Sequence, residues 1–158
     1  MSNERPFGTA VPPPFSTDRH GLEVLDKSSC LRLLGSAHVG RVGFSSGALP
    51  VVLPVNFVLI GDTIVFRSED GVKTRAAHDA VVACFEVDGF DGLIHNGWSV
   101  LATGRLREVD NPEELQRAER LPLASWMSNG MDHYIELGIE LLSGRRLRDR
   151  SKRSTPEA

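Results

Sequence analysis

Residues 67–73 carry the side-chain types that bind phosphate. They read Arg-Ser-Glu-Asp-Gly-Val-Lys, between a predicted strand and a predicted short helix, with Arg75 two residues further on. Arginine offers a planar fork of donors, lysine a point charge and serine a hydroxyl, and a helix start adds unpaired N–H groups. Glu69 and Asp70 allow a second interpretation, in which these acids cap the helix and pair with the bases. The residues alone leave both interpretations open.

One segment matches the sequence of a catalytic serine motif but lacks the structural context that the motif needs. Residues 43–47 read Gly-Phe-Ser-Ser-Gly and match the nucleophile elbow G-x-S-x-G. That elbow needs a helix after the serine, whereas residues 48–59 contain two prolines and several β-branched residues and predict a strand. We therefore interpret residues 43–47 as a hairpin turn.

Neither the histidines nor the cysteines form a metal-binding pattern. The five histidines lie far apart, and Cys30 and Cys84 are 54 positions from each other. The sequence therefore predicts no metal site and two reduced thiols, and we interpret His78 and His133 as surface histidines. Trp98 opens a predicted strand, where a tryptophan can cover the core, form a flat wall for an aromatic ligand or anchor a dimer interface; Trp126 has the same ambiguity.

The elements that would position these residues are mostly extended. A first helix is predicted after a cap at Asp26 or Ser28, with Gly35 ending it. Gly61-Asp62 is a two-residue hairpin signal. Strands are predicted at residues 38–44, 51–60, 63–67, 81–87, 98–109 and 133–142, and further short helices at residues 72–79 and 110–120. The connections are too short for repeated βαβ crossovers, so we expect a mainly β (α+β) fold, a six-stranded antiparallel barrel with short peripheral helices.

Length and composition indicate one globular domain. The 158 residues are 41% hydrophobic and 25% charged. Residues 1–20 contain four of the nine prolines and predict a disordered leader, residues 21–148 the folded domain, and residues 149–158 a disordered basic tail.

Charge and hydropathy exclude two classes of partner. Up to Gly144 the chain has 12 basic and 19 acidic residues, which argues against a nucleic-acid-binding surface. No stretch is apolar enough to be a signal peptide or to span a bilayer. We expect a cytoplasmic protein without nucleic-acid or membrane partners.

Several motifs follow one another in a recognisable order. They are residues 38–44, 53–57, 64–68, 71–73, 84–88, 97–100, 104–105 and 143–146. In this order the chain resembles the pyridoxamine 5′-phosphate oxidase-like family, the flavin-binding split β-barrels that include flavin- and deazaflavin-dependent reductases of actinobacteria. The resemblance covers about residues 28–147.

The resemblance implies a homodimer with two equivalent flavin sites in the clefts between subunits. By residue-by-residue matching, the segment Pro54-Val55-Asn56 would lie along the isoalloxazine ring. Arg67, Ser68 and Lys73 would hold the phosphate, and Trp98 and Ser99 would approach the flavin from the same or the other subunit. Trp126 and Arg145 correspond loosely to contacts from the partner chain.

The function that this resemblance implies is an FMN-binding oxidoreductase that transfers hydride between the flavin and a small organic substrate. One alternative is an F420-dependent reductase, in which Arg75 or the basic C-terminus would bind the longer acidic tail of that cofactor. Others are a non-catalytic flavin- or haem-binding protein and a structural dimer with a degenerate site. Val72 stands where the true oxidases have a second basic residue, so we do not expect activity on pyridoxamine phosphate.

Overall fold

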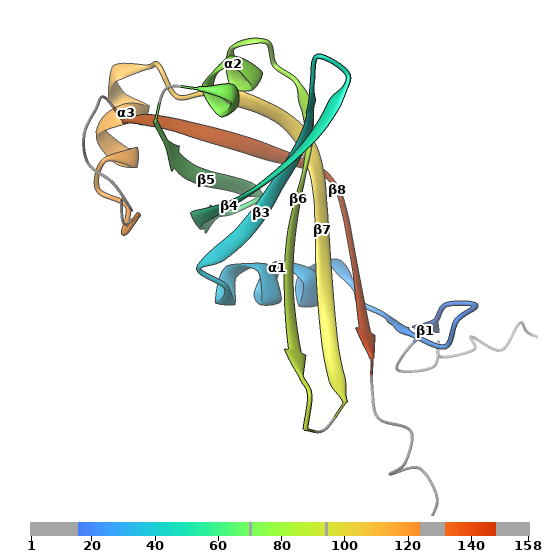
Figure 1. Ribbon diagram of the computed structural model, residues 1–158. Coiled ribbons are helices and arrows are strands. Elements are labelled where there is room, and N and C mark those ends of the chain that lie inside the picture. The colour runs from blue at the N-terminus through green and yellow to red at the C-terminus, as the bar shows by residue number, and fades with distance from the viewer. Residues whose placement is uncertain (1–15, 70, 94, 124–131, 148–158) are drawn as a thin grey trace, which may run out of the picture.

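The fold is described from a computed structural model, whose described residues are 16–69, 71–93, 95–123 and 132–147. The elements in chain order are β1 (Ser16–Thr17), β2 (Glu23–Val24), α1 (Lys27–Ser36), β3 (Val39–Ser46), β4 (Leu49–Ile60), β5 (Thr63–Ser68), α2 (Val72–His78), β6 (Val82–Asp91), β7 (Asn96–Glu108), α3 (Pro112–Ala118) and β8 (His133–Leu147) (Figure 1). None of the helices in these ranges has the length and apolar character needed to cross a membrane.

Six antiparallel strands form a closed barrel, as the sequence predicts. The ring runs β8-β5-β4-β3-β6-β7 and closes because β7 also pairs with β8. β8 makes this closure possible through its length: its first half pairs with β5, and nearly all of it pairs with β7. The short strands β1 and β2 extend the sheet from the end of β8.

The β3–β4 connection is a tight hairpin. Gly47 and Ala48 form its turn with positive φ angles of 53° and 65°, and Ser46 pairs with Leu49. Two successive positive φ angles give the turn the twist that a two-residue hairpin needs. No helix follows Ser45, so the hairpin is confirmed, but residues 43–46 belong to β3 and the turn lies at Gly47-Ala48, later than predicted.

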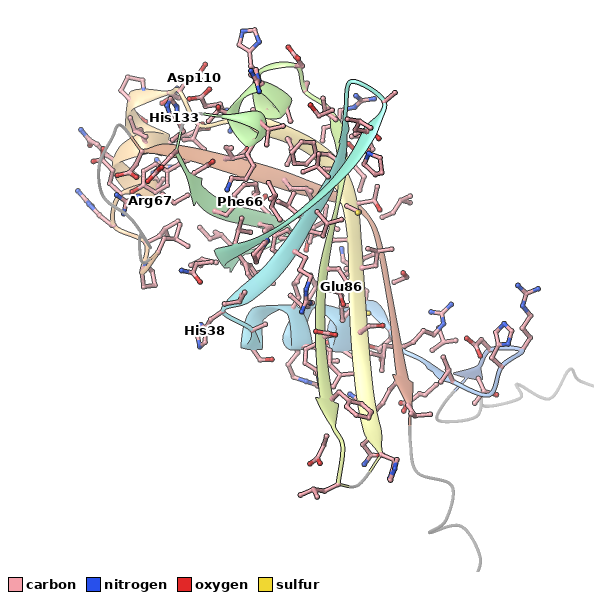
Figure 2. All side chains as sticks on the ribbon, viewed as in Figure 1. His38, Phe66, Arg67, Glu86, Asp110 and His133 are labelled. Atoms are coloured by element: carbon pink, nitrogen blue, oxygen red, sulfur yellow. The ribbon has the colours of Figure 1, made fainter. Side chains whose placement is uncertain are left out.

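Aromatic rings fill the centre of the barrel. Phe85 is fully buried, meets Phe57 edge-on at 4.8 Å between ring centroids and stacks on Phe66 at 6.4 Å. Figure 2 labels Phe66 within the barrel. α1 packs against β4, β7 and β8, and its Leu34 is fully buried in the same core.

A second, smaller core lies outside the barrel. It joins β5 and β8 to α3 and the segment after α3 through five buried residues: Val65, Val109, Ala118, Leu123 and Tyr134. On β5, Val65 faces this outer core while Ile64 and Phe66 face the barrel interior, because successive strand residues point to opposite faces.

The bounds of several elements differ from the prediction, and the differences at α1 and β8 have a structural reason or a clear consequence. Asp26 caps α1 by accepting a hydrogen bond from the Ser29 backbone N–H, but the helix continues through Gly35 to Ser36. β8 continues past Ser143 and Gly144 to Leu147, because Gly144 lets the strand approach α1: a Cβ there would lie 2.6 Å from the Cys30 Sγ. β1 and β2 were not predicted.

The predicted leader and tail stay predictions. Residues 16–20 form β1 and the turn after it. The remainder of the predicted leader and the predicted tail lie outside the described residues.

Candidate functional site

Arg67 and Ser68 at the end of β5 point to opposite faces of the sheet. Arg67 is half-buried on the outer face, which we define as the barrel surface that carries Pro54 and Asn56 of β4 and Arg67 of β5. Ser68 is 4% exposed on the interior side, and its hydroxyl donates to the Glu69 carbonyl. The two predicted phosphate ligands therefore do not converge through their side chains.

Two of the predicted site residues, Asn56 and Arg67, lie side by side on the outer face. Phe57 pairs with Phe66, so continuing this antiparallel register by one residue places Asn56 opposite Arg67. Pro54 is exposed on the same face, while the Val55 side chain is 6% exposed within the barrel core. Only the Val55 backbone is left to contact a ligand.

Lys73 and Arg75 lie on α2, directly after the turn that follows β5. The helix start is fixed by Thr74, whose Oγ1 accepts from the Gly71 N–H at 2.9 Å and donates to the Gly71 carbonyl at 2.8 Å. Lys73 is half-buried, and this burial lowers its pKa; the negative charge of Glu69 offsets part of the effect. Arg75 is exposed.

Arg67 already has an anionic partner. Its Nη2 donates to Asp132, the residue before β8, in an ion pair whose side chains are 23% and 22% exposed. Sequence reasoning did not identify Asp132, because nothing in the local pattern indicates that it lies beside Arg67. The proximity of the two residues can be inferred only once the strand register is known, because Arg67 pairs with Tyr134 of β8.

Trp98 and Ser99 lie elsewhere on the same chain. β8 lies between β5 and β7, but Arg67 pairs with Tyr134 near the start of β8, whereas Trp98 pairs with Arg146, twelve residues or about 40 Å further along that strand. Trp98 packs against the barrel core, with its ring over Gly89, and Ser99 is exposed on the outer face beside Arg145. One copy of the chain therefore does not bring these two residues to Arg67 and Lys73.

The remaining candidates have partners or lie outside the description. Arg145 donates from Nε to Asp18 at 3.1 Å. Trp126 lies outside the described residues. The interpretation of His133 as a surface residue is wrong: its side chain is 22% exposed and its Nδ1 contacts Glu108, because β8 begins at His133 and lies between β5 and β7.

A charged cluster that the sequence did not indicate lies on β3 and β6, the strands between β4 and β7. Arg41 of β3 contacts Glu86 at 3.0 Å and Asp88 at 3.2 Å, both on β6. These partners are 45 and 47 positions from Arg41, so the register alone brings them together. Figure 2 shows Glu86 well away from Arg67 and His133.

Comparison with known proteins identifies the family. The model of the pyridoxamine 5′-phosphate oxidase family matches residues 26–146. The chain belongs to this family. It is 36% identical over 128 residues to the uncharacterized protein Rv0080 of Mycobacterium tuberculosis, covering 78% of this chain and 84% of that protein.

Solved structures of other actinobacterial proteins have a similar fold. An FAD binding protein from Mycobacterium smegmatis is 28% identical with a TM-score of 0.66, over 80% of this chain and 98% of that one. A conserved protein of unknown function from Corynebacterium diphtheriae is 30% identical with a TM-score of 0.66, over 78% and 96% of the two chains. The resemblance seen in the sequence is confirmed, as is the split-barrel fold.

Proposed function

We propose that this protein binds a flavin and transfers hydride between it and a small organic substrate, at sites shared by two copies of the chain. The observation that carries the proposal is the position of Asn56 and Arg67 on one outer face, with Lys73 on the helix that follows. In a family with an FAD binding protein as a relative at 28% identity, a basic and amide-bearing face suits a phosphorylated flavin.

Lys73 is the phosphate ligand with the clearest physical support. Burial disfavours its charged form, and a phosphate beside it would favour that form. Arg67 would add a fork of donors, and Arg75 an exposed charge further along α2. Ser68 would act only through its backbone or after a side-chain movement, because its hydroxyl is buried against Glu69.

The ring would lie along β4. Pro54 presents an apolar surface, Asn56 an amide and Val55 its backbone, so this edge of the strand offers both contact area and hydrogen bonds. A bound flavin supplies the hydride chemistry, and these residues bind and orient it. The proposal therefore requires no catalytic acid or base from this chain.

Exposed apolar side chains support a homodimer. By the strand register, one row across the outer surface of the barrel holds Val52, Gly43, Cys84, Thr103 and Leu141. Val52 and Leu141 in this row are 65% and 69% exposed. Exposed apolar side chains on one row are a suitable contact for a second copy, which could bring its Trp98 and Ser99 to the flavin.

The first experiment identifies the cofactor. An absorbance spectrum of the purified protein is followed by titrations with FMN, FAD and F420, and by size-exclusion chromatography with light scattering. We expect saturable binding of a flavin by a dimer, with FMN as the preferred form and F420 as the alternative. Binding without turnover under any reductant would favour a storage or sensing protein, and a monomer that binds no flavin would overturn the proposal.

Lys73→Ala tests the phosphate assignment. We expect flavin affinity to fall by roughly ten- to a hundredfold, the loss of a charge-assisted contact of about 1.5–3 kcal/mol. Lys27→Ala is the matched control, because Lys27 is an exposed lysine whose ion pair with Asp62 lies at the start of α1. Equal affinities for the two variants would remove Lys73 from the site.

A further inference from the structure

Arg67 is held in the described structure by a carboxylate of its own chain. It extends from β5 on the outer face, and its Nη2 donates to Asp132 just before β8. Both side chains are more than three-quarters buried, so the pair is shielded from water and from salt. The position predicted for the flavin phosphate therefore already has an internal anion beside it.

The guanidinium fork is only partly used by this contact. Among the described residues, the Arg67 Nε–H has no hydrogen-bond acceptor, although the atom is buried. Arginine presents its donors in a plane that matches the two oxygens of a phosphate or a carboxylate. A buried donor without an acceptor is unfavourable, so the fork is suited to an anion that engages it more completely.

Lys73 differs from Arg67 in this respect. It is the second residue of α2, and the charge of Glu69 offsets only part of the effect of burial on its pKa. Lys73 therefore favours an incoming anion directly, whereas Arg67 must first give up or share the Asp132 carboxylate. That carboxylate would also repel a phosphate that approaches the same fork.

We propose that Asp132 competes with the ligand phosphate for Arg67 and thereby lowers the affinity of the site for phosphorylated ligands. This inference rests on the proposed function, because it concerns the same site. Ligand binding would exchange the internal ion pair for the pair between Arg67 and the phosphate. Asp132 is thus a residue that tunes affinity and has no part in hydride transfer.

The test is Asp132→Asn with FMN and with riboflavin, which lacks the phosphate. The Asn side chain keeps the shape and can still accept from Arg67, so the fold is expected to be retained; Asp132→Ser serves if it is not. We expect Asp132→Asn to bind FMN roughly tenfold more tightly than the wild type, with unchanged riboflavin affinity. Asp62→Asn, which removes an exposed carboxylate paired with Lys27, is the matched control and should change neither affinity.

The outcomes separate this inference from the proposed function. Weaker FMN binding by Asp132→Asn would mean that Asp132 positions Arg67 for the ligand, and unchanged binding would mean that the two do not compete; either result overturns the inference. If no form of the protein binds any flavin, the proposed function fails. Inorganic phosphate and pyrophosphate then test the inference alone: a larger phosphate-induced rise in melting temperature for Asp132→Asn than for Asp62→Asn supports it, and equal rises overturn it.

Discussion

Closure of the barrel depends on the absence of a side chain at Gly104. The antiparallel register of β7 and β8 shifts between Thr103 and Gly104, where it skips Glu140 of β8, and the two strands approach closely there. A Cβ at position 104 would overlap the Gly138 carbonyl oxygen and come within 3.0 Å of its carbonyl carbon. Gly104→Ala therefore forces the two backbones apart at the seam of the barrel.

The expected cost follows from which atoms must move. The obstructing group is backbone held in a ladder, so it cannot rotate away as a side chain could. Overpacking of this kind costs typically 1–3 kcal/mol, and we expect about 3 kcal/mol here. For a chain of this size that lowers the melting temperature by on the order of 10 °C. At Gly138, by contrast, a Cβ would meet nothing within 4 Å.

Urea unfolding of Gly104→Ala and Gly138→Ala, followed by circular dichroism, measures both effects. Gly138→Ala should leave stability unchanged or raise it by roughly 0.4–1 kcal/mol, because alanine restricts the unfolded chain more than glycine. If Gly104→Ala proves as stable as the wild type, or if both variants lose the same stability, the close approach of β7 and β8 is not as described.

Two further predictions concern the core and the first helix. Phe85→Ala should lower the free energy of unfolding in urea by about 3–5 kcal/mol, because Phe85 is fully buried and contacts Phe57 and Phe66. Phe90→Ala is the control and should lower it little, because Phe90 is 71% exposed. Equal losses of stability in the two variants would contradict this description of the core. The hydrogen bond from the Ser29 backbone N–H lowers the pKa of Asp26 below its ordinary value of 3.8. The ionised cap therefore stabilises the fold above pH 3.8, and this stability is lost as the pH falls through the lowered pKa. Asp26→Asn keeps the cap but not the charge, so its unfolding free energy should approach that of the wild type on acidification, and a constant difference from about pH 6 to about pH 2 would refute the assignment.

The barrel was predictable because its signals are local. Alternating residues, the Gly61-Asp62 turn and short connections each depend on neighbouring positions, and together they leave few topologies. β1 and β2 were missed because two residues give no period. The last strand was predicted to end at residue 142, before Gly144, because the reason for this glycine, the close approach of α1, depends on the fold.

The site was predictable only in part. The period of two on β5 was enough to place Arg67 and Ser68 on opposite faces, although the resemblance grouped them as ligands. The contacts of Arg67 with Asp132 and of Arg41 with Glu86 join residues 65 and 45 positions apart, so they depend on register. Such pairs have no sequence signal, and they set the electrostatics of the outer face.

The position of β8 in the chain has a consequence for biosynthesis. β8 follows all the other strands in sequence, yet it supplies the neighbour of both β5 and β7. While the ribosome is still making it, those two strands each have an edge with unpaired N–H and C=O groups, which can pair with another nascent chain. The interval before residue 147 emerges is therefore the stage at which this protein would most need a chaperone.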